Sequence, residues 1–98
     1  MLYAVLFEDD DEHAEQRARY MSQHLDFLQR NGAQIQAAGP LREASDGAPA
    51  GGLWLVNADS QQQLQALIEA DPLWPTGLRK SVRCLAWQQV FAAGNKLT

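Results

Sequence analysis

The chain has 98 residues, of which 46% are hydrophobic and 20% are charged, and its formal net charge is −4. This length leaves no room for a second hydrophobic core, so we expect residues 1–98 to form a single domain. The acidic balance, with no stripe of Lys and Arg, argues against a nucleic-acid partner. Because Cys84 is the one cysteine, the chain has no internal disulfide and no cysteine-rich zinc site.

Leu2 to Phe7 form a short, wholly apolar run that ends at an acidic cluster. Tyr, Val and Phe favour strands, and a run without polar positions predicts a strand buried on both faces. The run is far too short to span a bilayer and no basic leader precedes it. We therefore expect no membrane association and a cytoplasmic location.

The acidic residues 8–12 are typical of a helix start, because carboxylates interact favourably with the unpaired N–H groups of the first turn. Beyond them, apolar residues recur at helical spacing: Ala14, Ala18, Met21, Leu25 and Leu28. This stripe predicts one helix over residues 11–30. Asn31-Gly32 supplies its end, since glycine readily adopts left-handed geometry.

Two strands joined by a long loop are expected next. The weakly patterned residues 33–38 run into Gly39-Pro40, and a strand that meets proline ends there or lies at a sheet edge. Residues 42–52, with three glycines and a proline, predict the loop. Leu53 to Val56 resume the strand pattern, so the pair is typical of a hairpin.

A second helix and a last strand complete the chain. Asp59-Ser60 offers an N-cap for a helix with an apolar face, which ends at Ala70-Asp71 because Pro72 disfavours helical geometry in the residue before it. A turn over residues 72–77 leads to the last strand. Its alternation predicts Cys84 as a small core residue, and residues 94–98 are expected to be loose.

The resulting order, strand-helix-strand-strand-helix-strand, predicts an α+β ferredoxin-like fold with an antiparallel sheet. Right-handed crossovers put the first and third strands in the centre and both helices on one face. The opposite face stays bare although the central strands are apolar throughout. We therefore expect a homodimer in which two sheets pack face to face.

His24 lies on the first predicted helix, beside the apolar stripe. One interpretation is a histidine at the core edge with one satisfied hydrogen bond, which is the more common case for a lone histidine near an apolar face. The other is a proton-transfer residue, because unperturbed imidazole titrates at about pH 6.5. The local sequence leaves both interpretations open.

Asp71 ends the second predicted helix, where the negative end of the helix dipole disfavours a carboxylate. Its usual role before a proline is to start a turn, by accepting hydrogen bonds from the next backbone N–H groups. The alternative is a carboxylate that reaches an imidazole and fixes its tautomer.

Three further residues bear on a binding site. Arg17 lies two helical turns before His24 and is able to bind an anionic group bidentately, although an exposed arginine is the more common interpretation. Trp74, in the predicted turn, is a candidate for lining a pocket. His13 is expected to be solvated, and the two histidines lack metal-ligand spacing, so we expect no metal site.

Residues 17–25, 38–41 and 71–73, followed by Gly77-Leu78 and a strand ending at Trp87, resemble in order and spacing the YciI-like (YCII-related) family of the dimeric α/β-barrel superfamily. The resemblance spans residues 1–90. It implies a ferredoxin-like fold and a sheet-to-sheet dimer. The chain departs from the family pattern in the shorter, glycine-rich loop 42–52 and at Leu73 and Trp74, which leaves the substrate open.

The family carries a His–Asp pair in a pocket, proposed as an active site, and its two residues match His24 and Asp71. The family arginine matches Arg17, with Arg19 as an alternative, and Gly39 and Pro40 would form part of the pocket wall.

The resemblance implies cofactor-independent general acid/base chemistry, isomerisation or elimination, on a small organic molecule. A dimeric protein that binds a small molecule without catalysis is the alternative, and a purely structural domain is a third. The expected partners are a second copy of the chain, in a dimer or a higher oligomer, and a small-molecule ligand.

Overall fold

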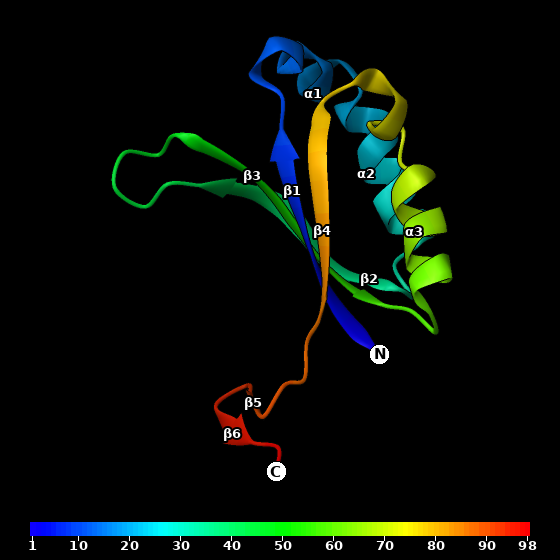
Figure 1. Ribbon diagram of the computed structural model, residues 1–98, viewed down its shortest axis with the longest axis vertical. Coiled ribbons are helices and arrows are strands. Elements are labelled where there is room, and N and C mark those ends of the chain that lie inside the picture. Colours follow the sequence, from blue (N-terminus) through cyan, green and yellow to red (C-terminus); the bar gives the residue numbers. More distant parts are fainter.

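The computed structural model describes residues 1–98 and contains one four-stranded antiparallel sheet with the strand order β2-β3-β1-β4. The strands are β1 (Leu2–Asp9), β2 (Ile35–Arg42), β3 (Pro49–Asn57) and β4 (Arg79–Ala86). The helices α2 (Met21–Arg30) and α3 (Gln61–Glu69) cover one face of the sheet, and α1 (Glu15–Arg19) lies beyond the upper end of β1 (Figure 1). This arrangement confirms the predicted ferredoxin-like fold.

The core lies between the sheet and the helices. Alternate residues of β1 and β3 point into it, as the period of two in a strand requires. Ten buried residues form one cluster: Tyr3, Val5, Phe7, Phe27, Ile35, Trp54, Val56, Ala58, Leu64 and Ile68. Full burial of each large apolar side chain contributes about 1.5–3 kcal/mol, so this cluster is the main source of the domain's stability.

The opposite face of the sheet has no cover within the chain. Leu53 and Leu55 of β3 are half-buried there, whereas Leu85 of β4 and Trp87 just after it are 39% and 44% exposed. In the single chain, β1 and β3 are thus fully buried on the helix side only, and burial of their other face by a second copy stays a prediction. We call this surface, formed by Ala4, Leu53, Leu55, Leu85 and Trp87, the bare face.

The predicted helix over residues 11–30 is wrong in one respect, because it is divided into three segments. A 3-10 turn, η1 (Asp11–His13), precedes α1, and α2 follows after Tyr20. Asp10 caps η1 by accepting a hydrogen bond from the N–H of Glu12 at 3.0 Å. Tyr20 leaves helical geometry at φ −107° and ψ 10°, although the N–H of His24 still bonds its carbonyl at 2.9 Å. The predicted stripe is only partly the buried face, because Ala14, Ala18 and Leu25 are exposed. The residues that α2 buries are His24 and Phe27.

The hairpin of β2 and β3 is longer than predicted and extends beyond the rest of the sheet (Figure 1). β2 continues through Gly39-Pro40 because it is an edge strand, where a missing N–H is tolerated, so the edge alternative is confirmed. β3 begins at Pro49, which shortens the predicted loop 42–52. Gly51, at φ +86°, lies so close to Phe7 that a Cβ would sit 1.9 Å from the Phe7 carbonyl oxygen.

The second half of the chain follows the sequence pattern closely. Ser60 Oγ accepts a hydrogen bond from the N–H of Gln63 at 3.1 Å, which confirms the N-cap of α3. The turn after α3 contains the 3-10 segment η2 (Trp74–Thr76) and ends at Gly77 with φ +85°. Cys84 is exposed, and the core expectation for it is wrong because β4 is an edge strand.

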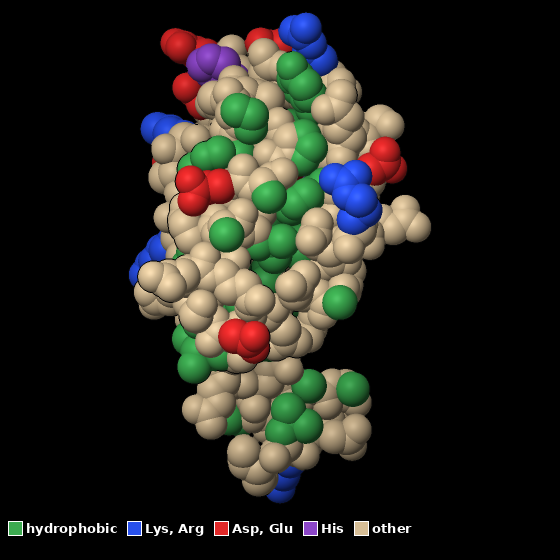
Figure 2. Space-filling model, turned by 90° about the vertical axis from the view of Figure 1, so that its right-hand side faces the viewer, with side chains coloured by type: hydrophobic (Ala, Val, Ile, Leu, Met, Phe, Trp, Pro, Cys, Tyr) green, Lys and Arg blue, Asp and Glu red, His purple; other side chains and the backbone are tan.

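The chain ends in a small lobe below the domain body. There β5 (Phe91–Ala92) pairs with β6 (Asn95–Lys96), and Figure 2 shows this lobe separated from the body by a narrow waist. The looseness expected of residues 94–98 stays a prediction, because a paired hairpin can still move as a unit. No helix of the chain is both long and apolar enough to cross a membrane.

Candidate active site

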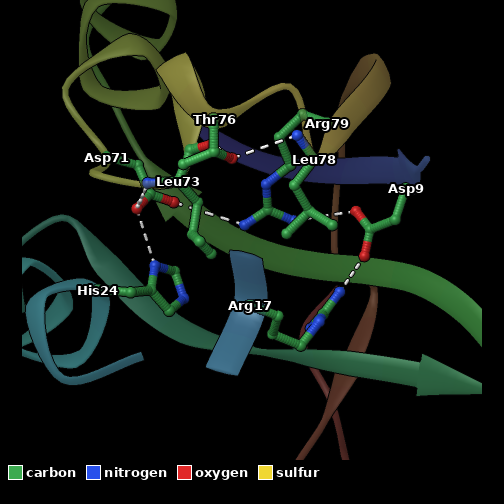
Figure 3. Close-up of polar contacts among 8 residues, drawn as sticks. All are labelled: Asp9, Arg17, His24, Asp71, Leu73, Thr76, Leu78 and Arg79. Atoms are coloured by element: carbon green, nitrogen blue, oxygen red, sulfur yellow. Dashed lines mark hydrogen bonds and ion pairs between the residues drawn. The ribbon is translucent and has the colours of Figure 1, made fainter. Parts of the chain in front are cut away.

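His24 is one of two buried residues of α2, and its ring is held from both sides. It is 8% exposed, and it stacks on the Trp54 ring of β3 with centroids 6.4 Å apart and an angle of 28° between the planes. Its Nδ1 lies 2.8 Å from Oδ1 of Asp71 (Figure 3). The ring orientation is therefore fixed by packing and by one short hydrogen bond.

Asp71, at the end of α3, is 2% exposed and uses both carboxylate oxygens. Oδ1 accepts hydrogen bonds from His24 and from the N–H of Leu73 at 3.0 Å. Oδ2 accepts one from Nη2 of Arg79 at 3.4 Å. The carboxylate thus accepts the backbone hydrogen bond that the turn interpretation requires and also lies within hydrogen-bond distance of His24, whose tautomer stays a prediction.

The partner of Nδ1 determines the state of the other ring nitrogen of His24. A carboxylate only accepts hydrogen bonds, so Nδ1 donates to Asp71. In the neutral imidazole Nε2 then carries the lone pair. The pair is therefore arranged to take a proton at Nε2 and to stabilise the imidazolium that results.

A cavity of about 100 Å³ adjoins His24. It brings together Arg17, His24, Gly39 and Pro40, four of the residues singled out in the sequence. One further cation, Arg79, also lines it. The rest of the lining is uncharged and comprises Met21, Leu25, Leu28, Ala38, Gly52 and Trp54. The cavity thus combines one imidazole, two guanidinium groups and an aromatic wall.

The structure shows where Arg17, Arg19 and Trp74 lie relative to this cavity. Arg17 lines the cavity, whereas Arg19 is exposed and lies over the Tyr20 ring at 5.7 Å. Trp74 is absent from the wall of this cavity and packs against the hydrophobic core, so its proposed role in binding has no support from the cavity lining. The turn directs its side chain toward the core.

Sequence reasoning missed two charged residues of the site, Arg79 and Asp9. Arg79 forms ion pairs with Asp71 and, at 3.5 Å, with Asp9. Asp9 also accepts a hydrogen bond from Arg17 (Figure 3). In the sequence Asp9 is one residue of an acidic run and Arg79 precedes the alternating part of the last strand. No local signal distinguishes either residue from a surface charge.

The fold and the site together define the class of protein. It is a ferredoxin-like α+β domain with a buried histidine–carboxylate pair beside a small cavity. Residues 1–88 match the YCII-related domain, and the chain belongs to that family. No curated protein matches the chain.

Two solved structures are similar to the whole domain. One is 5-chloro-2-hydroxyhydroquinone dehydrochlorinase (TftG) from Burkholderia phenoliruptrix AC1100 in complex with 2,5-dihydroxybenzoquinone, at 25% identity over 90% of this chain and 94% of that chain, with a TM-score of 0.79. The other is a mutant of MhuD with two manganese protoporphyrin IX bound per active site. It is 10% identical over 96% of this chain and 98% of that chain, with a TM-score of 0.51, and it shows the fold alone.

Proposed function

We propose that the protein is an enzyme that uses His24 as a general acid/base, oriented by Asp71, to isomerise a small cyclic or unsaturated molecule or to eliminate a group from it. The observation that carries the proposal is the 2.8 Å hydrogen bond from His24 Nδ1 to Asp71, which leaves Nε2 free beside a cavity. Such chemistry needs neither a nucleophile nor a metal or other cofactor.

The proposed step is a proton transfer. Nε2 of His24 takes a proton from a carbon or hydroxyl group of the substrate, and the released electron pair forms a new double bond. In an elimination the leaving group departs with its own electron pair, whereas in an isomerisation the imidazolium returns the proton to another carbon. Asp71 stabilises the imidazolium between the two events.

The likeness to TftG supports the elimination branch. TftG is a dehydrochlorinase, and the molecule bound in its structure is a small dihydroxylated ring. A planar ring of this kind fits a site with an aromatic wall, Trp54, and a cation, Arg17, which is able to bind an oxyanion. We therefore propose small oxygenated rings, with or without a halogen, as the substrate class.

We further propose that the enzyme is a homodimer or higher oligomer that associates through the bare face. Soluble monomers seldom expose a continuous apolar surface, and all six residues that line the shallow depression on this face are hydrophobic. A second copy of the chain offers the same apolar surface and covers both at once.

The proposal is tested with the complete chain. His24→Gln and Asp71→Asn are compared with the unmodified protein for turnover of 5-chloro-2-hydroxyhydroquinone and of aromatic lactones, and for binding of 2,5-dihydroxybenzoquinone. Loss of a general base costs about 10²–10⁴-fold in rate, so turnover falls by this factor while the fold, seen by circular dichroism, is kept.

Two other outcomes would contradict an enzymatic role. Loss of affinity without any turnover in the unmodified protein indicates a ligand-binding protein. If both variants leave turnover and affinity unchanged, the pair has a purely structural role.

A further inference from the structure

Arg79 links the buried carboxylate of Asp71 with the partly buried carboxylate of Asp9, and its own side chain is only 4% exposed. Nη2 lies 3.4 Å from Oδ2 of Asp71, and Nη1 lies 3.5 Å from Oδ1 of Asp9. Burying a guanidinium is costly unless it is paired with an anion. Here each of the two terminal nitrogens of Arg79 faces a carboxylate, Nη2 that of Asp71 and Nη1 that of Asp9. The pairing therefore keeps this charge in place beneath the cavity.

A β-bulge turns Arg79 toward the site. β1 and β4 pair residue by residue from Phe7 with Val82 to Glu8 with Ser81, but Asp9 is then opposite Arg79 because Lys80 is skipped. Without this shift, alternation would put Arg79 on the same face as Arg83 and Leu85, away from the helices. Bulges beside functional sites commonly re-aim a side chain in this way.

The guanidinium of Arg79 also packs against Phe7 and Gly52. Its central carbon lies 4.0 Å from the centroid of the Phe7 ring, a cation–π arrangement. Gly52, the residue opposite Phe7 on β3, is also a neighbour, since a Cβ there would lie 3.5 Å from Nη1 in ordinary van der Waals contact. Burial lowers the pKa of Arg79, against the opposing effects of Asp71 and Asp9, yet an arginine in a protein stays protonated. The group is therefore a fixed positive charge in a fixed place.

We propose that Arg79 is a positioning residue for the His24–Asp71 pair, and this inference rests on the proposed function. Oδ1 of Asp71 already serves His24 and Leu73, whereas Arg79 is the only hydrogen-bond donor to Oδ2. By holding Oδ2, Arg79 fixes the carboxylate plane so that Oδ1 faces Nδ1 of His24. The imidazole then keeps its proton on Nδ1 and its lone pair on Nε2.

Arg79 also lines the cavity, so a direct contact with substrate is the rival role. The two roles differ in what they require of Asp71. A positioning residue acts only through Asp71, whereas a residue that contacts substrate acts independently of it. A double-mutant cycle between the two residues therefore separates them.

The first experiment reads the tautomer of His24 from the ring ¹⁵N chemical shifts of the complete, unliganded chain. We expect the Nδ1–H form in the unmodified protein, a mixture or the Nε2–H form in Arg79→Met, and an intermediate state in Arg79→Lys. Arg83→Met, which alters an exposed arginine of the same strand, leaves the spectrum unchanged.

A folded Arg79→Met or Arg79→Lys variant with the unaltered tautomer would overturn the proposal. If Arg79→Met does not fold, the lysine variant decides. This readout needs no substrate, so it fails or succeeds independently of whether the protein is an enzyme.

The second experiment is the double-mutant cycle of Arg79→Met and Asp71→Asn, measured with a substrate that the unmodified protein turns over. Arg79→Met is expected to lower kcat by about 10–100-fold, the usual effect of losing a residue that orients a functional group, with KM little changed. In the Asp71→Asn background the same substitution causes no further loss. Equal losses of kcat in both backgrounds would show a direct contact with substrate and overturn the positioning role.

Discussion

Nδ1 of His24 and Oδ1 of Asp71 lie 2.8 Å apart although 47 positions separate the two residues in the chain. The histidine comes from α2 and the aspartate from the turn just after α3, and the two helices lie on the same side of the sheet (Figure 1). Because Asp71 also bonds Leu73 and Arg79, its carboxylate is a structural junction as well as the partner of the imidazole.

The first prediction follows from that junction. Asp71→Ala leaves Arg79 with one carboxylate fewer and removes the acceptor of the Leu73 N–H, so we expect the free energy of unfolding to fall by about 3–5 kcal/mol. Asp71→Asn retains an acceptor for Leu73 and costs less. Urea unfolding measures both, with Asp26→Ala on the exposed side of α2 as a control that stays within about 0.5 kcal/mol. An Asp71→Ala variant as stable as the control would show that the hydrogen bonds of Asp71 do not stabilise the fold.

Arg17 is expected to set the preference for anionic ligands. A hydrogen bond to a charged group contributes about 1.5–3 kcal/mol, so Arg17→Gln should weaken binding of benzoate by about 10–100-fold and leave its neutral counterpart benzamide little changed. Isothermal titration measures both affinities. Arg19→Gln, two residues away and outside the cavity, is the matched control. Equal losses of affinity for benzoate and benzamide would show that Arg17 does not select anionic ligands.

The bare face is expected to hold two chains together. Leu55→Lys and Leu85→Lys place a charge in an apolar contact, so each should reduce the light-scattering mass from a multiple of the chain mass toward 10.9 kDa. Leu25→Lys alters a leucine on α2 that is 54% exposed, and it should leave the mass unchanged. An unmodified protein that scatters as a single chain at micromolar concentration would refute the dimer.

Alanine substitutions at Gly51 and Gly47 separate the cost of a steric clash from the cost of a positive φ. Both have positive φ, +86° and +76°, but an added Cβ meets the Phe7 carbonyl at Gly51 and open space at Gly47. We expect Gly47→Ala to cost about 1–2 kcal/mol, the penalty of left-handed geometry. Gly51→Ala should cost clearly more, because β1 and β3 must separate. Thermal unfolding of the two variants compares them, and equal melting temperatures would contradict the close approach.

Cys84 is expected to be accessible but slow to react. Partial burial raises the pKa of its thiol above the ordinary value, so less thiolate is present at a given pH. Alkylation by iodoacetamide should therefore go to completion in the native protein, with a rate that rises with pH and has its midpoint above that of the same chain in urea. A native protein that reacts faster than the unfolded one at pH 7.5 would show that another group activates the thiol.

The sequence by itself determined the order of the elements, because each depends on neighbouring residues. The spacing of apolar residues from Ala14 to Leu28 predicted helix, although the structure buries His24 and Phe27 there. Ser60 and Pro72 mark the limits of α3 by caps and sterics that act over a few residues. The apolar strands then allow few topologies. For His24 and Asp71 the local sequence left structural interpretations ahead, and the family resemblance alone paired them.

Only the tertiary structure decided which side chains share the site. The shift at Lys80 depends on how β4 pairs with β1, some 70 residues earlier, and it turns Arg79 toward His24 and Asp71. The same long-range packing directs Trp74 to the core and leaves Cys84 exposed on an edge strand. A shift of one residue in a strand pairing reverses the face of every side chain beyond it, and such a shift is set by the partner strand rather than by the residues themselves.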